Sequence, residues 1–193
     1  MSKPKHVILF NGPPRAGKDV GALTLYNMGG YRLLRFSDPL KAALPAFFNL
    51  PAKDLEVTKD EANPDLPYNM TYRQAQISLS EDWAKVQFGQ SIFGELLARR
   101  IAEEDKDCVI PDSGFLAELI GLVSAAQLAD CQFLVIRVER PGKTFARDSR
   151  GYLTPGSMHG WANLKFATVE NNGSITSYVR AVRKAVHAWK SDL

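Results

Sequence analysis

The sequence of 193 residues has few cysteines, few histidines and no long apolar run. Its two cysteines, Cys108 and Cys131, show no spacing with histidine that is typical of a zinc site, and two thiols are too few for a disulfide scaffold. The most apolar long stretch, residues 115–138, is interrupted by charged and amide side chains, among them Glu118, Gln127, Asp130 and Gln132, which excludes a membrane span. We therefore expect a domain stabilised by an apolar core, with buried, reduced thiols.

We expect no export signal at the amino terminus. Only four apolar residues precede Asn11-Gly12-Pro13, whereas a signal peptide needs roughly 7–15 of them. Hydrophobic residues make up 45% of the chain and charged residues 23%, with a net charge of +3. This composition predicts a single cytoplasmic domain over residues 1–193, mildly basic and compatible with ligands that carry phosphate.

Short apolar runs alternate with helical patterns along the chain. The runs predict five strands, at residues 6–10, 31–36, 108–112, 132–138 and 166–169. The helical patterns cover residues 19–28, 38–48, 80–101, 115–128 and 174–190. Alternation of this kind predicts a parallel sheet with helices on both faces, whose ligands bind beyond the carboxyl ends of the strands. Two polar segments interrupt it, an insertion at about 49–82 and a lid at about 140–160.

A glycine-bounded turn follows the first predicted strand. It has the G-x-x-x-x-G-K pattern of a phosphate-binding loop and continues into a predicted helix through Val20. The loop consists of Gly12, Pro13, Pro14, Arg15, Ala16, Gly17, Lys18 and Asp19. Its glycines allow backbone N–H groups to face a β-phosphate, and Lys18 can reach the β- and γ-oxygens. The strict pattern has Ser or Thr where Asp19 stands, so Asp19 is expected to contact Mg²⁺ directly or through water.

Charged residues near the other strand ends favour a kinase. Arg140, Arg147 and Arg150 lie in the predicted lid, where they can neutralise the oxygens of a phosphoryl group in transfer. Asp112 ends a strand near the expected Mg²⁺, and it can hold a metal-bound water or act on the acceptor. Phe115 flanks a polar turn there and is a candidate for stacking on an acceptor base.

Segments scattered over the chain resemble phage deoxynucleoside monophosphate kinase-like proteins of the P-loop class. They are the phosphate loop, Phe36–Lys41, Arg73–Glu81 with Lys85, Phe88-Gly89 with Phe93-Gly94, Asp112–Phe115 with Glu118, Arg140–Gly142 with Thr144-Phe145, Asp148–Tyr152 and Asn171–Ser174. The phosphate loop, with Asp in its last position, is the most specific of them. Relatives of the T-even type have Arg where Gly114 stands here, so this chain departs from the family at that position.

The resemblance implies an ATP-dependent kinase with a three-layer P-loop NTPase or nucleoside monophosphate kinase-like fold. Lys18 and the loop amides would bind the ATP phosphates, and residues 171–174, including Asn171 and Gly173, would contact adenine. Asp38, Arg73 and Asp112 would face the acceptor, and the three lid arginines the transferring phosphate. A phage protein of this kind would act in the cytoplasm of the host cell.

The sequence leaves the acceptor open. A nucleoside monophosphate is already an anion at pH 7 and needs no general base, whereas a hydroxyl needs a carboxylate within hydrogen-bond reach. The leading hypothesis is a deoxynucleoside monophosphate, and the alternative is a hydroxymethyl pyrimidine within DNA, contacted by the basic last helix. A further alternative is a non-catalytic ATP-binding module that regulates a partner. Assembly as a homodimer is also open.

Overall fold

A five-stranded parallel sheet forms the centre of the computed structural model, which describes residues 6–51, 55–146, 148–157 and 160–193. The strands are β1 (His6–Asn11), β2 (Tyr31–Leu33), β3 (Asp107–Ser113), β4 (Gln132–Glu139) and β5 (Leu164–Glu170). They lie in the order β2-β3-β1-β4-β5, and every neighbouring pair is parallel. The predicted five-stranded parallel sheet is confirmed. Because β1 is the central strand, the loop that follows it opens at the middle of the carboxyl edge.

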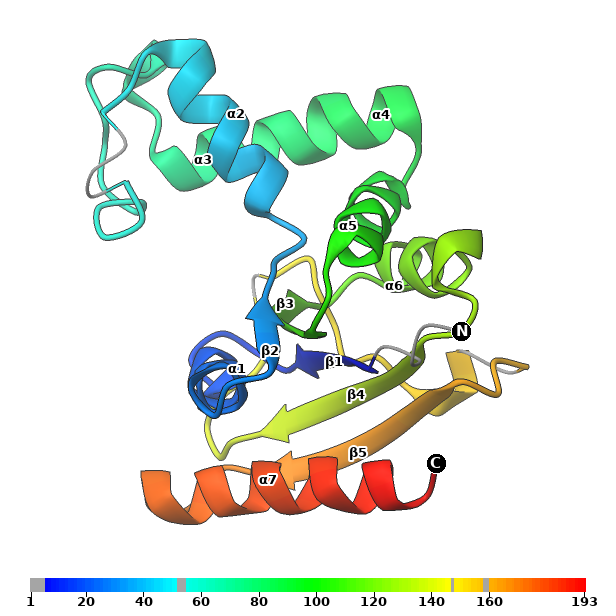
Figure 1. The fold of residues 1–193 in the computed structure, drawn as a ribbon. Helices are drawn as coiled ribbons and strands as arrows, with labels where there is room; N and C mark the ends of the chain where they lie inside the picture. Colours follow the sequence, from blue (N-terminus) through cyan, green and yellow to red (C-terminus); the bar gives the residue numbers. More distant parts are fainter. Residues whose placement is uncertain (1–5, 52–54, 147, 158–159) are drawn as a thin grey trace.

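Helices cover both faces of this sheet, as Figure 1 shows. On one face lie α1 (Lys18–Asn27) and α7 (Ile175–Ser191), and on the other α5 (Ile92–Glu103) and α6 (Leu116–Val123). Alternate side chains of β1 enter the two cores: Val7 and Leu9 pack toward α5 and α6, and Ile8 and Phe10 toward α1 and α7. This alternation explains why β1 is apolar along nearly its whole length.

A smaller lobe stands above the α5 and α6 layer (Figure 1). It contains α2 (Asp38–Phe48), η1 (Pro67–Asn69), α3 (Tyr72–Ile77), the π-helical η2 (Ser78–Ala84) and α4 (Lys85–Phe88). Its own core consists of Leu44, Leu50, Leu55, Leu66, Tyr72 and Ala75. The segment predicted as an acceptor-side insertion thus contributes much of a lobe that has a separate apolar centre.

The single long helix predicted over residues 80–101 is wrong. The chain instead begins a helix at Tyr72, behind a capping box of Thr71 and Gln74, and ends it at Phe88. Gly89 has φ +97°, a left-handed conformation that terminates a helix, and α5 starts afresh at Ile92. Trp83, on the first segment, is 52% exposed, so this segment does not bury its tryptophan in the core.

The other helix predictions agree with the structure, with one shortening. The helices α2 and α7 begin at Asp38 and Ile175, close to the starts of the predicted ranges 38–48 and 174–190, and the Ser174 side chain accepts from the Ser177 backbone N–H at 3.1 Å. The predicted helix over 115–128 ends at Val123, and a separate turn, η3 (Ala126–Leu128), follows it. No helix within the described ranges is long and apolar enough to cross a membrane.

Candidate functional site: a phosphate loop beside a fixed arginine

The turn between β1 and α1 requires both of its glycines. Gly12 has φ +159°, and a Cβ atom there would lie 2.5 Å from the Val138 carbonyl oxygen. Gly17 has φ +111°, and a Cβ atom there would lie 2.5 Å from Asn171 Nδ2. Any larger residue would therefore push the loop away from β4 and from the turn after β5. The loop adopts the strand–turn–helix arrangement that its sequence pattern predicts.

Lys18 is the first residue of α1 and is only 7% exposed. Its Nζ donates to the Pro13 carbonyl at 2.8 Å, and its other two N–H bonds have no acceptor among the residues that the structure describes. Burial, together with the nearby Arg150, lowers its pKa to about 8. A buried ammonium with unused donors, set at a helix N-terminus, is suited to bind an anion.

Arg150 reaches this point from the segment that follows β4. Its Cβ, Cγ and Cδ lie across Gly114, where an added Cβ atom would meet them at 2.7–2.8 Å. The next residue, Gly151, donates its N–H to the Gly114 carbonyl at 3.1 Å. The absence of a side chain at Gly114 thus leaves the space that Arg150 occupies.

Asn11, the last residue of β1, fixes the same segment. Its side chain is fully buried and donates to the carbonyls of Ser113 at 3.2 Å and Gly151 at 2.9 Å. Its Oδ1 accepts from the Leu153 N–H at 2.9 Å. One amide therefore joins β1, the end of β3 and residues 151–153. A buried amide with all of these hydrogen bonds made is strongly stabilising, because each loss would leave a buried partner unsatisfied.

The residues expected around adenine lie beside the phosphate loop. Asn171 donates from Nδ2 to the Ala16 carbonyl at 2.7 Å, which braces the loop from outside, and Gly173 lies two residues further on in the same turn. Arg140 donates to the Arg15 carbonyl at 3.3 Å. Arg147 falls outside the described residues. A cavity of about 490 Å³ lies next to these groups, lined by Glu139, Arg140, Pro141, Tyr152, Glu170 and Asn172.

The two strand-end aspartates hold the chain around α2. Asp112 accepts from the Phe36 N–H at 3.1 Å through Oδ1, and from the Ser37 N–H and Oγ at 3.1 and 2.8 Å through Oδ2. Burial raises the pKa of Asp112, and these hydrogen bonds oppose the shift. Asp38 Oδ2 accepts from the Arg35 N–H at 3.0 Å and from Arg100 at 2.7 Å. Both carboxylates therefore already have structural partners.

Asp19 is the carboxylate that best fits a magnesium ion at this site. It lies in the first turn of α1 with 74% of its side chain exposed, and Arg35 is 3.7 Å away. Magnesium keeps several waters and is held by one or two carboxylates together with substrate phosphates. Asp19 can supply such a ligand, and Asp112, with its oxygens already hydrogen-bonded, fits a role through water. The described residues contain no preformed group of three metal-ligating side chains.

Arg73 and Phe115 are the remaining residues that the sequence predicted to contact the acceptor. Arg73 is the second residue of α3 and forms an ion pair with Asp60, which raises its pKa, and the nearby Arg150 opposes that shift. The Phe115 ring lies under Lys85, whose Nζ is 3.7 Å from the ring centre. Lys85 also lies 3.2 Å from Glu118 and 2.8 Å from Glu81. The buried contact between Lys85 and Glu118 links the smaller lobe to α6.

Stability should depend on pH through Glu118. Burial raises its pKa from 4.5 to about 7, although Lys85 opposes the shift. The folded protein keeps this proton over a range in which the unfolded chain has lost it, so the free energy of unfolding should fall as pH rises from about 4.5 to 7. Relative to Glu118→Gln, the wild type should lose roughly 2 kcal/mol across that window. Urea unfolding at several pH values measures it, and a pH-independent difference would contradict the prediction.

Several site residues are not identifiable from sequence pattern. Asn11 precedes the loop without belonging to its motif, and Tyr178 donates its hydroxyl to the Gly17 carbonyl at 3.0 Å from 161 residues away. Lys85, Glu118 and Asp148 lie in segments that carry the family resemblance, and that resemblance was the one signal available for them. Their contacts depend on tertiary structure.

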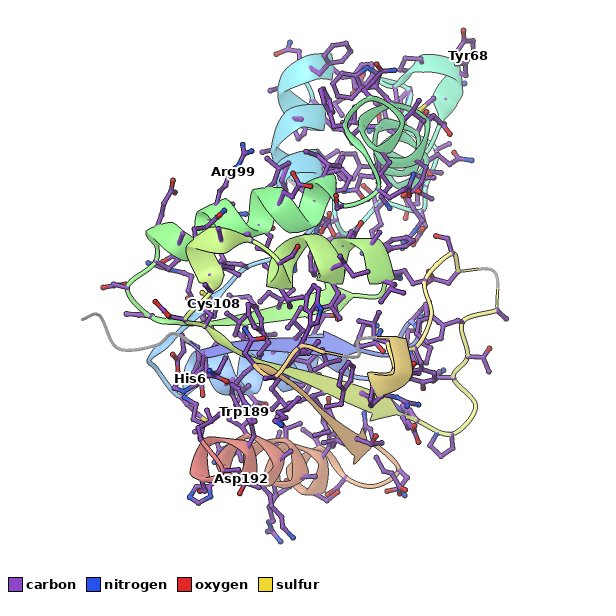
Figure 2. All side chains as sticks on the ribbon, turned by 90° about the vertical axis from the view of Figure 1, so that its right-hand side faces the viewer. His6, Tyr68, Arg99, Cys108, Trp189 and Asp192 are labelled. Carbon is purple, nitrogen blue, oxygen red and sulfur yellow. The ribbon has the colours of Figure 1, made fainter. Side chains whose placement is uncertain are left out.

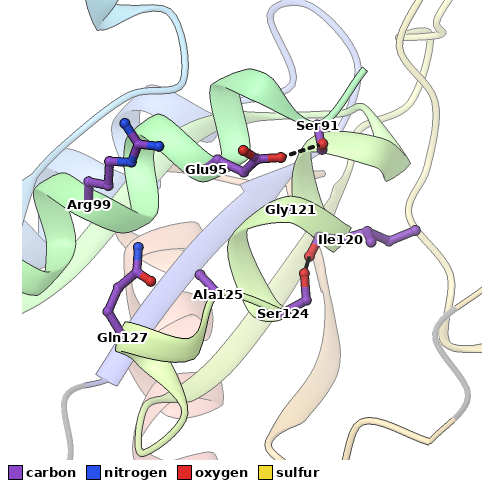
Figure 3. Close-up of a pocket in the computed structure, with 8 residues that line it drawn as sticks. All are labelled: Ser91, Glu95, Arg99, Ile120, Gly121, Ser124, Ala125 and Gln127. Carbon is purple, nitrogen blue, oxygen red and sulfur yellow. Dashed lines mark hydrogen bonds between the residues drawn. The ribbon is translucent and has the colours of Figure 1, made fainter. Parts of the chain in front are cut away.

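A second cavity lies away from the phosphate loop. It has a volume of about 390 Å³ and lies between α5 and the end of α6, lined by residues that include Ser91, Glu95, Arg99 and Gln127 (Figure 3). Ser91 Oγ donates to Glu95 at 2.7 Å across its rim. None of its lining residues belongs to the loop or to a strand end, so this cavity is separate from the site.

No family model matches the sequence, and no curated protein matches it. Among solved structures, the Thermus thermophilus protein TT1252 is 18% identical with a TM-score of 0.50, over 96% of this chain and 97% of that one. A sugar kinase from Janibacter sp. HTCC2649 is 8% identical (TM-score 0.48, 95% of each chain), and a gluconokinase from Sinorhizobium meliloti 1021 is 12% identical (TM-score 0.46, 100% of each). The strand order, with helices on both faces, agrees with the predicted P-loop kinase-like fold, and the likeness to TT1252 extends over nearly the whole of both chains.

Proposed function

We propose that this protein is an ATP-dependent phosphotransferase that moves the γ-phosphate to a (deoxy)nucleoside monophosphate, with Mg²⁺ held at Asp19. The observation that carries the proposal is the pairing of two buried or half-buried cations, Lys18 and Arg150, at the mouth of the glycine-bounded loop. Phosphoryl transfer is catalysed chiefly by positioning and by neutralising negative charge. These two side chains would supply both.

The state of the aspartates supports a phosphate acceptor over a hydroxyl acceptor. Transfer to a hydroxyl needs a carboxylate that can take its proton, whereas a monophosphate is already ionised. Asp112 and Asp38 both accept hydrogen bonds from the chain around α2, which makes them poor general bases. Arg73, close to Arg150, would instead contribute charge to an acceptor phosphate.

The cavity beside Arg140 would hold the adenine of ATP. It lies at the carboxyl ends of β4 and β5 and is lined by Arg140, which donates to the Arg15 carbonyl of the phosphate loop. Tyr152 provides an aromatic ring in its wall. The Arg137 guanidinium lies 4.6 Å from the centre of that ring, which fixes the ring's orientation. A flat, half-apolar base fits a site of this kind.

A hydroxymethylated pyrimidine within DNA is the second candidate acceptor. Glu118 favours it, because burial raises the pKa of this carboxyl to about 7, within the range of a general base that takes a hydroxyl proton. The basic side chains of α7 weigh against it. That helix starts beside Gly17, but its last turns lie at the amino edge of the sheet, where Trp189 stacks edge-on against His6 (Figure 2). Most of its exposed cations are therefore far from the loop.

The decisive experiment is an acceptor screen. With ATP and Mg²⁺, we expect ADP to form in the presence of at least one nucleoside monophosphate, and no label to transfer to duplex DNA that contains hydroxymethyl pyrimidine. Transfer to the DNA alone would establish the second candidate. Binding of ATP without turnover on any acceptor would instead point to the non-catalytic regulatory module.

A further inference from the structure

Arg150 uses only one edge of its guanidinium within the protein. Nε donates to Asp148 Oδ1 at 2.9 Å and Nη2 to Asp148 Oδ2 at 2.6 Å. A guanidinium has five N–H donors in a fixed plane, so this pairing leaves the edge formed by Nη1 and the second Nη2 hydrogen. That edge has no acceptor among the residues that the structure describes. It is the right shape for two oxygens of one phosphate.

Arg150 lies close to Lys18, although its own pKa is raised, chiefly by the ion pair with Asp148. It is one of the two main causes of the lowered pKa of Lys18, so the two cations lie close enough to repel each other. Bringing like charges together in a partly buried site costs free energy, so other contacts must hold Arg150 in place. Here the Arg150 stem packs on Gly114, and the backbone on its carboxyl side is tied to Asn11.

Asp148 supplies the remaining restraint. Besides the two bonds to the guanidinium, its Oδ1 accepts the Arg150 backbone N–H at 3.0 Å, and 14% of its side chain is exposed. The carboxylate therefore fixes both ends of the same residue. It also lies near Lys18, because it is among the groups that raise the pKa of that lysine.

We propose that Asp148 is a positioning residue: it clamps Arg150 as a preformed phosphate-binding group beside Lys18, so that a phosphate enters between two cations already in place. The proposal rests on the proposed phosphate site and adds a residue to it. An arginine held in this way loses little conformational freedom when the anion binds, which favours tighter binding.

The proposal predicts that Asp148→Asn changes anion binding in the direction opposite to that expected from the loss of a negative charge. Asp148 is negative and lies near the phosphate site, so if it acted through charge alone, Asp148→Asn should strengthen the binding of an anion. If it acts by holding Arg150, the same change should weaken binding. If Asp148 acts through Arg150, Asp148→Asn should not weaken anion binding any further in a protein that already lacks Arg150.

The test is calorimetric titration of the full chain with inorganic tripolyphosphate, which needs no acceptor and no turnover. We expect Asp148→Asn and Arg150→Ala each to weaken binding at least about tenfold, and the double variant to bind no more weakly than Arg150→Ala alone. Arg150→Lys should bind as poorly as Arg150→Ala, because an ammonium cannot pair with a carboxylate and a phosphate along two edges. Asp130→Asn, exposed before β4 at the opposite end of the sheet, is the matched control and should bind as the wild type does.

Tighter binding by Asp148→Asn, or a further loss when it is added to Arg150→Ala, would overturn the proposal. Full affinity in Arg150→Lys would overturn it as well, because charge alone would then suffice. A wild-type protein that does not bind tripolyphosphate would refute both this clamp and the phosphate site. The expected binding pattern in a protein that phosphorylates no acceptor would refute the kinase function and leave the clamp intact.

Discussion

Lys18→Met should lower kcat/KM for ATP at least about 100-fold while leaving the protein as stable as the wild type or more so. The loss follows because a positioned cation on phosphate oxygens contributes on the order of 3 kcal/mol to the transition state. The gain in stability follows because Lys18 is 7% exposed and burial holds its pKa near 8, so the folded protein bears the cost of a desolvated ammonium. Steady-state kinetics and thermal unfolding measure the two effects.

Lys106→Met is the matched control for this change. Lys106 is exposed just before β3, at the amino edge of the sheet, and its replacement should alter neither activity nor stability. A Lys18→Met variant that keeps its activity, or that loses it only because it unfolds, would contradict the assignment.

The lowered pKa of Lys18 also predicts that ATP binding takes up protons. With a pKa of about 8, roughly half of the Lys18 side chains are unprotonated at pH 8, and a bound phosphate would restore the proton. Binding should therefore take up about half a proton at pH 8 and little at pH 7, as calorimetry in buffers of different ionisation enthalpy can measure. Equal uptake at both pH values would show that Lys18 does not lie against the phosphates.

Gly94→Ala should be among the most destabilising single substitutions in the chain. Gly94 lies in α5, and a Cβ atom there would be 2.0 Å from the Glu118 carbonyl oxygen and 2.8 Å from the Leu122 nitrogen. Both are backbone atoms of α6, so the two helices would have to separate. We expect a loss of about 3 kcal/mol or more, and a melting temperature lower by roughly 6–12 °C.

Gly156→Ala isolates the effect of crowding from that of losing a glycine. No atom lies within 4 Å of a Cβ atom at Gly156, and its backbone is not in the left-handed region. This variant should therefore be neutral or slightly stabilising. A melting temperature for Gly94→Ala within about 2 °C of the wild type would show that the α5–α6 contact adjusts without cost.

The fold could be predicted because its main signals are local. Five short apolar runs predicted the strands, and the helical patterns over 38–48 and 174–190 predicted α2 and α7. The break at Gly89 was missed because the apolar spacing continues across it, and the spacing does not reveal a left-handed glycine. A π-helical turn over 78–84 adds a further rotation that a regular pattern cannot predict.

Only the part of the site that is contiguous in the sequence could be predicted. The phosphate loop carries its own spacing, and so Gly12, Gly17 and Lys18 could be identified. The roles of Asn11 and Gly114 could not, because each acts on a segment more than 30 residues away in the chain. The strand-end aspartates were expected to face a substrate, but whether a carboxylate is available or already hydrogen-bonded depends on the neighbours that folding brings to it.

The hydrogen bonds of the Asn11 amide limit where the length of this chain can be changed. The Asn11 side chain hydrogen-bonds to both Gly151 and Leu153. The stretch that carries Arg150 is therefore fixed in position relative to β1. Insertions and deletions after β4 should be tolerated between Arg140 and Asp148, but not between Asp148 and Leu153. About seven residues, 141–147, are therefore open to changes of length.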